Sequence, residues 1–208
     1  PGLIWGTAFT LAVAVGANTA LFSVLNGVVL QPLPYEAPDQ LVMIWESNPS
    51  QGLDQEPTSE ATFLDWRSQA RTFQSMAAFR YRGFTLLQEN NPQRLASVLV
   101  TPSIFDVLRV QPVLGRRFLP EEEAPGNERI VILSDRAWRA RFGADPRILG
   151  QTITLDGEPY EVVGVMEQGF SFPVGDDEVE AWSPLTIGLP GVADRPHRMY
   201  STIGRLAD

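Results

Sequence analysis

The sequence of 208 residues contains no cysteine and no lysine, and it contains a single histidine. Without cysteine the chain cannot build a disulfide framework, a thiolate metal site or a cysteine nucleophile. The lone histidine, His197, lies beside two arginines in the stretch DRPHRM, so a histidine-based triad or a multi-histidine metal site has one candidate at most. These absences argue against a nucleophilic or transition-metal centre.

The sequence also lacks the short motifs that carry much enzyme chemistry. It contains no G-x-S-x-G nucleophile elbow, no P-loop and no G-x-G-x-x-G dinucleotide turn. We therefore predict that the chain is not an enzyme, that it has no catalytic residue and that it binds neither a cofactor nor a metal ion.

Positive charge is scarce as well. All 16 basic residues are arginines, and 25 acidic residues leave a formal net charge of -9. This balance repels phosphate backbones, so nucleic acid is not expected as a partner. A hydrophobic content of 44% with 10% aromatic residues is typical of a folded protein.

Residues 3–30 are predominantly apolar and contain no charged side chain. As a helix rising about 1.5 Å per residue, this stretch would extend roughly 42 Å, whereas the hydrocarbon core of a bilayer is about 30 Å thick. A cleaved signal peptide is the main alternative, but its apolar region is shorter, about 7 to 15 residues, and follows a basic stretch. We therefore predict a transmembrane helix over residues 3–30.

The segment after this helix is acidic and rich in proline. Between Gln31 and Trp66 there is no basic residue, and such residues favour the cytoplasmic side of a membrane. The following domain is therefore expected outside the cytoplasm. Residues 31–40, QPLPYEAPDQ, contain three prolines, which cannot continue a helix, and we predict a stiff linker there.

Within the predicted membrane helix, small side chains recur every four residues at Ala12, Gly16 and Ala20. Together with Asn18 they are candidates for packing against a neighbouring helix of the membrane. The alternative is that alanine and glycine are simply common in membrane helices, and the sequence leaves both interpretations open.

Beyond residue 40 the patterns predict a mixture of strands and helices. Alternating strands flank Asp156-Gly157, a dipeptide suited to a two-residue type I′ turn, in QTITLDGEPYEVVGV. A second hairpin is predicted from FTLLQ to RLASVLV, and the stretches GFSFP and AWSPL are predicted as loops. The other predicted strands are LVMIWE (41–46), IVIL (130–133) and STIGRLA (201–207).

Three helices are expected in the same region. The first begins near Ala61 and has an apolar face made by Phe63, Trp66, Ala70 and Phe73. The second is a short capped helix in TPSIFDVLRV. The third has Ser134 as its N-cap and Gly143 as its C-cap, and the arginines from Arg136 to Arg141 are expected on its solvent-exposed side.

Acidic residues gather in two places of this region. Such clusters can bind Ca²⁺ through oxygen ligands or supply general acid and base groups, but these lie in loop-like sequence without the spacing of an EF-hand. We favour solvated acidic surfaces. The clusters are Glu121–Glu123 and the group Asp176, Asp177, Glu178 and Glu180.

The order of these motifs resembles the periplasmic core domain of MacB-like and FtsX-like ABC transporter permeases, in particular orphan permeases of acidobacteria. The resemblance covers almost the whole chain. It rests on GANTALFSVLNGVVLQPLPY, TPSIFDVLRVQPVLGRRF, IVILSDRAWRARFGADPRILGQTITLDGEPYEVVGVM and the closing GRLAD.

The resemblance implies an α+β fold with an N-terminal transmembrane helix over residues 3–30, a linker over 31–40 and a mixed α/β periplasmic core domain over 41–208, made of two lobes with antiparallel hairpins. It further implies a bacterial inner-membrane protein whose noncatalytic outer domain couples membrane-helix movement to partner or substrate engagement in export. Expected partners are the membrane, other helices of the same permease, a separate ABC ATPase and a periplasmic adaptor or exported substrate. After GRLAD the family continues with further elements, so we expect one lobe to be truncated at the C-terminus.

Two other functions remain open at this stage. A membrane-tethered ligand-binding or sensor module would have a deep apolar pocket with convergent polar groups. A hydrolase would bring two of the clustered carboxylates together in a cleft.

Overall fold

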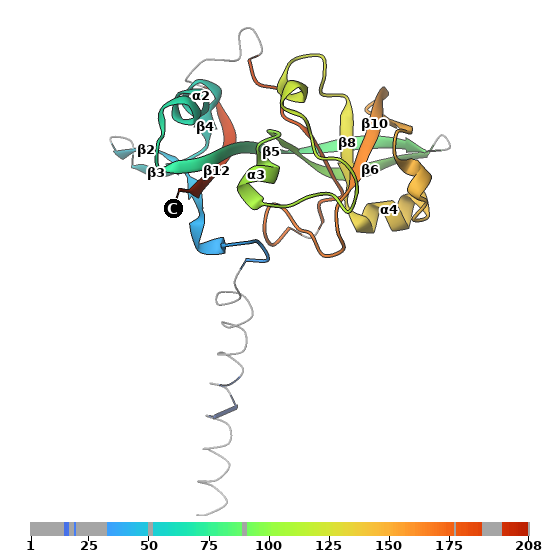
Figure 1. The fold of residues 1–208 in the computed structure, drawn as a ribbon, viewed down its shortest axis with the longest axis horizontal. Helices are drawn as coiled ribbons and strands as arrows, with labels where there is room; N and C mark the ends of the chain where they lie inside the picture. Colours follow the sequence, from blue (N-terminus) through green and yellow to red (C-terminus); the bar gives the residue numbers. More distant parts are fainter. Residues whose placement is uncertain are drawn as a thin grey trace, which may run out of the picture. The chain divides into compact units, whose positions relative to one another are not determined.

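The computed structural model describes residues 15, 16, 19, 33–49, 52–88, 91–176, 178–188 and 197–207 (Figure 1). Two compact units divide the chain, residues 1–34 and residues 35–208. The predicted membrane helix over residues 3–30 lies outside the described residues except for Val15, Gly16 and Thr19, which are helical. Within the described ranges, none of the helices combines the length and the hydropathy needed to span a bilayer.

The second unit is built on one ten-stranded mixed sheet. The strand order is β1-β12-β5-β6-β11-β8-β10-β7, with β4 paired to β12 and β9 paired to both β10 and β5. Two pairs are parallel, β11 with β6 and β10 with β8, and the others are antiparallel. The strands are β1 (Leu41–Ile44), β4 (Thr58–Ser59), β5 (Phe73–Gln88), β6 (Asn91–Val100), β7 (Leu114–Gly115), β8 (Ile130–Leu133), β9 (Thr152–Leu155), β10 (Glu158–Val165), β11 (Ala181–Pro184) and β12 (Arg198–Leu206).

Strand β5 joins the two ends of this sheet. Its first half pairs with β12 from Phe73 to Phe79, and its second half pairs with β6 from Phe79 to Gln88. Residues 35–208 form one compact unit, and the division into two lobes stays a prediction. The 16 residues of β5 carry hydrogen bonds from one half of the domain to the other.

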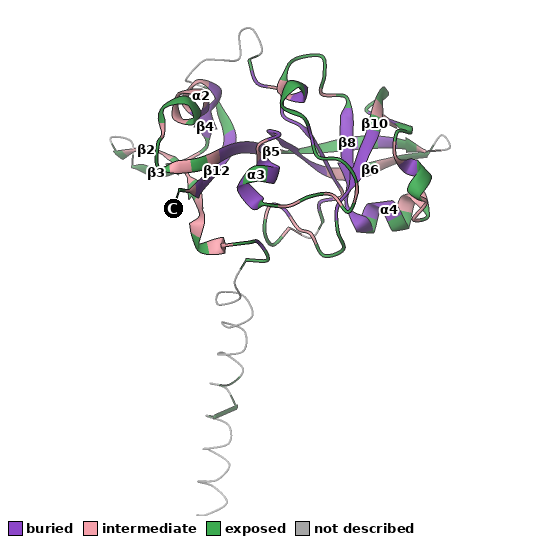
Figure 2. Cartoon of the chain, viewed as in Figure 1, coloured by how far each residue is buried: buried purple, intermediate pink, exposed green. Residues whose placement is uncertain are grey.

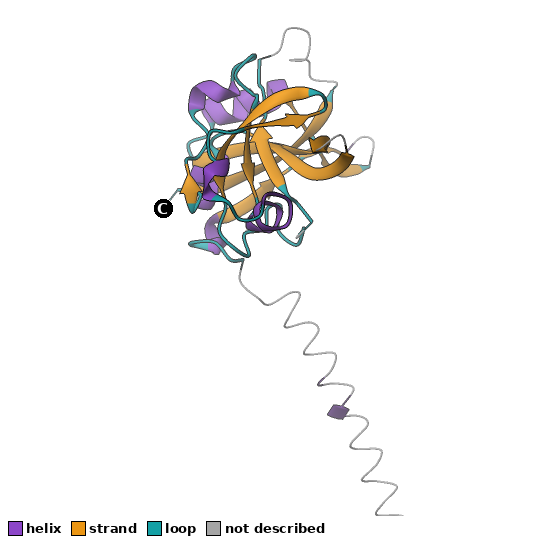
Figure 3. Cartoon of the chain, turned by 90° about the vertical axis from the view of Figure 1, so that its right-hand side faces the viewer, coloured by secondary structure: helices purple, strands orange, loops and turns teal. Residues whose placement is uncertain are grey.

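The helices are short and lie around the sheet, whose strands form the centre of the domain (Figure 3). In α4, Ser134 Oγ accepts a hydrogen bond from the amide of Ala137 at 3.1 Å, and Gly143 is left-handed, so both predicted caps are confirmed. The helices are α2 (Glu60–Gln69), α3 (Ile104–Leu108), α4 (Asp135–Phe142) and the 3₁₀ turns η1 (Pro38–Gln40), η3 (Pro120–Glu123) and η4 (Pro146–Ile148).

Two sequence predictions are wrong in this region. Helix α2 ends at Gln69, and Phe73, which we placed on its apolar face, begins β5 instead. The run from Met76 to Phe79 is apolar throughout because it is buried on both faces of the sheet. A continuous apolar run fits a helix or a strand equally well, so the sequence did not reveal the strand. The stretch AWSP is not a loop but strand β11, which pairs with β6 and β8.

Both predicted hairpins are confirmed. Asp156 and Gly157 have φ angles of 51° and 83°, as a type I′ turn requires, and join β9 to β10. The hairpin of β5 and β6 pairs as far as Gln88 with Asn91. A separate two-stranded sheet consists of β2 (Glu46–Asn48) and β3 (Leu53–Glu56).

Buried apolar residues form two clusters. Met76, Ala78 and Phe84 of β5 belong to one, and Ala77 and Phe79 belong to the other. Because successive side chains of a strand point to opposite faces, the two clusters lie on opposite sides of the sheet. Figure 2 shows the buried residues in purple along the central strands and on helix α3.

Candidate functional site

The segment from Tyr35 to Gln40 is attached to the domain at several points. Together with Arg109 and Arg205 we call it the base of the domain. Tyr35 is buried, and its hydroxyl donates a hydrogen bond of 2.5 Å to the carbonyl of Ser171. Burial raises the pKa of Tyr35, so this hydroxyl keeps its proton and its bond. The first residues of the domain are therefore fixed to a loop far along the chain.

Arg205 of β12 makes the largest set of contacts at the base. Its side chain is fully buried, with an exposed fraction of 0%. The guanidinium donates to three backbone carbonyls and one side-chain amide oxygen: Val107 (2.7 Å), Glu36 (2.8 Å), Ala37 (3.1 Å) and Gln40 (3.2 Å). Arg205 thus joins the start of the domain to the end of α3 and to β12.

These acceptors are all neutral. Burial and the positive charge of Arg109 lower the pKa of Arg205 from its ordinary value, but an arginine starts from a pKa so high that it stays charged. Arg109 itself pairs with the exposed carboxylate of Glu36 at 2.7 Å. The buried cation is stabilised by the carbonyl dipoles, whereas the ion pair lies in solvent.

Strand pairing brings the two ends of the domain together at the base. β1 and β12 are antiparallel, and Leu41 lies opposite Arg205 while Ile44 lies opposite Thr202. Figure 1 shows the start of the domain beside its C-terminal strand. The first and last strands of the domain are therefore neighbours.

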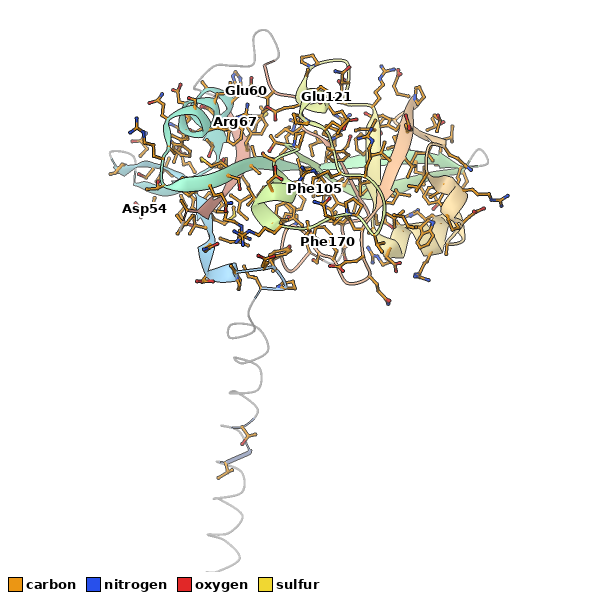
Figure 4. All side chains as sticks on the ribbon, in the orientation of Figure 1. Asp54, Glu60, Arg67, Phe105, Glu121 and Phe170 are labelled. Atoms are coloured by element: carbon orange, nitrogen blue, oxygen red, sulfur yellow. The ribbon has the colours of Figure 1, made fainter. Side chains whose placement is uncertain are left out.

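The predicted acidic surfaces are in fact divided among separate ion pairs. Glu122 is buried and pairs with Arg116 at 2.7 Å, while Glu123 pairs with Arg67 of α2 at the same distance. Arg67 and Glu121 lie on the same side of the sheet in Figure 4. Glu122 and Glu123 of η3 thus face cations, whereas Glu121 is exposed. Our prediction of a solvated cluster is wrong for Glu122.

In the second acidic group Asp177 lies outside the described residues, and Glu180 forms an ion pair. Glu180 pairs with Arg141 at 2.8 Å, and both side chains are largely buried. We predicted that Arg141 lies on the solvent-exposed side of α4, and this is wrong because the end of the helix packs against β6 and the residue before β11. Within the described ranges, no group of three or more His, Cys, Asp or Glu side chains is placed to hold a metal ion, and His197 is exposed.

Of the candidate helix-packing residues, Gly16 belongs to the described part of the chain. Ala12, Asn18 and Ala20 lie outside the described residues. Gly16 is helical and exposed, and no described atom lies within 4 Å of the position that a Cβ would take. Packing of this stripe against another helix stays a prediction.

The sequence analysis missed Arg205 as a functional residue, although a signal was present. In the strand STIGRLA, Arg205 follows Ile203 by two residues and therefore shares its face. Ile203 is buried, so the pattern places a cation at a position that faces the core. A charge at such a position needs acceptors from other segments, and these segments only meet in the folded domain.

Comparisons with solved structures identify the fold. The periplasmic region of MacB from Actinobacillus actinomycetemcomitans matches with a TM-score of 0.58 and 18% identity over 81% of this chain and 74% of that chain. The extracellular domain of the noncanonical ABC-type transporter YknZ from Gram-positive bacteria has a TM-score of 0.54 and 16% identity, covering 81% and 82%. A domain of a permease protein from Porphyromonas gingivalis has a TM-score of 0.63 and 15% identity, covering 83% and 77%. Identities this low show a shared fold.

The family is shown by the sequence. No curated protein matches the chain. The family model described as the MacB-like periplasmic core domain matches residues 5–208, which is nearly the whole sequence. The chain therefore belongs to the family of MacB-like periplasmic core domains.

Proposed function

We propose that this chain is a noncatalytic extracytoplasmic domain of an ABC-transporter-type permease, which couples movement of membrane helices to engagement of a partner or substrate in export. The observation that carries this proposal is the hold of Arg205 on the segment from Glu36 to Gln40, next to the paired first and last strands. Family membership and the folds of the similar solved structures support it.

The base provides a path for a mechanical displacement. The bonds of Tyr35 and Arg205 tie the first residues of the domain to a loop, to α3 and to β12. From β12 the hydrogen bonds continue through β5 to β6. At about 3.3 Å per residue, the length of β5 corresponds to roughly 50 Å. A displacement at Tyr35 would therefore move the distal hairpin as part of one rigid body.

The alternative of a sensor with a deep apolar pocket has less support. The most apolar hollow, lined by residues such as Phe105, Phe170 and Trp182, has a volume of about 10 Å³. Ligand sites commonly measure about 300 to 1,000 Å³, so this hollow is too small for a ligand. The larger groove of about 440 Å³ above β5 is lined by several charged side chains and is not a deep apolar pocket.

The alternative of a hydrolase is also disfavoured, because Glu122, Glu123 and Glu180 each pair with a different arginine. Asp176 and Glu178 do line one open hollow, of about 330 Å³, but Arg82 and Arg94 line it as well.

The first test is native purification of the full-length protein from membranes through a tag on the outer domain, followed by mass spectrometry. Recovery of an ABC-type ATPase together with a periplasmic adaptor or exported cargo supports the proposal. Repeated recovery of the protein alone, or with only a small molecule, contradicts it.

The second test addresses rigid-body coupling in the recovered complex. Because the chain has no cysteine, spin labels can be placed at the exposed positions Met43→Cys and Leu87→Cys. We expect the distance between the two labels to stay constant through ATP binding and hydrolysis, while the mobility of the label at residue 87 changes. A nucleotide-dependent change in the distance would show that the domain does not move as one body.

A further inference from the structure

A groove of about 440 Å³ crosses the sheet above β5. Its lining includes residues of β5, β6, β10, β11 and β12, with Phe84 of β5 buried next to the ring of Tyr160 at 5.3 Å. Arg80 and Arg82 share the face of Phe84, because alternate residues of a strand point to one side. The groove therefore combines an apolar floor with guanidinium groups.

Arg80 is the unusual member of this lining. Its Nε is buried without a hydrogen-bond partner among the described residues, and its Nη1 donates to the sulfur of Met199 at 3.5 Å. A thioether is a weak acceptor, and a buried N–H without an acceptor costs free energy, although the side chain of Arg80 as a whole is only half-buried. Because Nε has no accessible surface, a ligand in the groove meets the Nη groups of the guanidinium, whose hydrogen bond among the described residues goes to a thioether.

The neighbouring cations of the groove already have partners. Arg82 pairs with Asp156 at 3.2 Å, and Arg129 pairs with Glu158 at 2.8 Å. Glu128 also lines the groove, and its Oε2 accepts a hydrogen bond from the amide of Gly126. The total charge of these groups is close to neutral, which disfavours a ligand with several negative charges, whereas Arg80 can still bind a single one.

We propose that this groove is a binding site for an organic anion, a single carboxylate carried by an apolar group. The carboxylate binds the planar guanidinium of Arg80, which matches its two oxygens, and the apolar group packs against Leu99, Pro184 and Met199. The volume of the groove falls in the range of known ligand sites. This inference goes beyond the proposed coupling function and does not depend on an ATPase partner.

The sulfur contact of Arg80 supplies a reporter for the test. The chain has four methionines, of which Met199 lines the groove, Met43 is exposed elsewhere, and Met76 and Met166 are buried in the two cores. Methionine methyl groups labelled with ¹³C are observed by NMR in the 208-residue chain in lipid nanodiscs, during titration with N-acetyl-phenylalanine. We expect a saturable shift of the Met199 signal and no shift of the Met43 signal.

Matched probes define what the groove recognises. The amide of N-acetyl-phenylalanine has the same body without the charge, and inorganic phosphate has charge without an apolar body. Neither should shift the Met199 signal at the same concentration. Octanoate distinguishes two sources of the carboxylate: a response to N-acetyl-phenylalanine alone indicates peptide ends, and a response to octanoate indicates free aliphatic acids. Equal responses to the acid and its amide would overturn the proposal.

Three variants test the role of Arg80. The change Arg80→Gln should weaken binding by about tenfold or more, because hydrogen bonds to a charged partner are lost. Arg82→Gln, which removes a cation already paired with Asp156, should weaken it much less, and the exposed Arg71→Gln should leave it unchanged. Unchanged binding in Arg80→Gln contradicts the proposal.

The signals of Met76 and Met166 show in the same spectra whether each variant keeps its fold. If Arg80→Gln does not fold, the comparison of the acid with its amide on the unmodified chain still decides between carboxylate recognition and its absence.

Discussion

The base and the groove each contain an arginine without a carboxylate partner among the described residues, and the two arginines differ in what surrounds them. Arg205 at the base is fully buried, and its donors reach four neutral acceptors at 2.7 to 3.2 Å. Arg80 in the groove has a buried donor without an acceptor and a contact to a thioether. The two residues have the same chemistry but opposite hydrogen-bond environments.

This difference separates a structural cation from one that is available for binding. The acceptors of Arg205 come from segments far apart in the sequence, so the arginine holds the domain together where the chain enters it. Arg80 gains little from its present neighbours and can gain more from a ligand. A third residue, Arg198, represents the common case, because it pairs with the carboxylates of Glu46 and Glu56.

The largest expected effect is the loss of Arg205. Replacing it in Arg205→Met leaves buried carbonyls without donors, and we expect a loss of about 3 kcal/mol or more in the free energy of unfolding. Urea unfolding of the chain in detergent, followed by tryptophan fluorescence, measures this quantity. The control Arg71→Met changes an exposed arginine and should stay within about 0.5 kcal/mol. A loss for Arg205→Met as small as that of the control would show that the base does not depend on its guanidinium.

The opposite result is expected in the groove. Because Arg80 is poorly satisfied, Arg80→Met should leave the free energy of unfolding unchanged or raise it by about 1 kcal/mol. The same urea experiment, without added ligand, measures it. A loss comparable to that of Arg205→Met would mean that Arg80 has a structural role and that the comparison between the two arginines fails.

The carboxylate partners of Arg198 should make the free energy of unfolding depend on pH. The neutral acceptors of Arg205 should not. Desolvation raises the pKa of Glu46, but hydrogen bonds from Ser59, Thr62 and Arg198 outweigh it, so the net pKa is lowered from 4.5. Because the unfolded state binds the proton more readily, the Glu46 carboxylate stabilises the folded state above about pH 4.5. This contribution to the free energy of unfolding is lost as the pH falls through the pKa of the folded state.

Stability curves against pH test this prediction. Between pH 6 and pH 3, the unmodified chain should lose on the order of 1 kcal/mol more stability than Glu46→Gln, which has no proton to bind. Parallel curves for the two proteins would contradict the assignment.

The smallest effect is expected for the ion pair at the base. Glu36→Gln removes the exposed carboxylate that faces Arg109 but keeps the backbone carbonyl that Arg205 binds, so the loss should be below about 1 kcal/mol. The loss should also disappear at high salt. Urea unfolding at low and high ionic strength measures both. A large, salt-independent loss would show that the side chain of Glu36, and not its carbonyl, holds the base.

Features defined by neighbouring residues could be predicted from the sequence. The caps of α4 at Ser134 and Gly143 and the turn at Asp156-Gly157 depend on backbone conformation within a few residues, and all were found as expected. The end of α2 and the strand β11 were predicted wrongly. A strand that is buried on both faces lacks the alternation of apolar and polar residues by which a strand is identified. Such burial arises only when strands distant in the sequence pair.

The sequence by itself determined the family of this chain, the local hairpins and helix caps, and an acidic domain without cysteine. The tertiary structure alone decided which arginine is satisfied and which is not. Arg205 and Arg80 are each a single arginine within a strand, and neither position reveals its acceptors. Those acceptors come from α3, from the first residues of the domain and from β12, and hydrogen bonding depends on distances that exist only after these segments pack together.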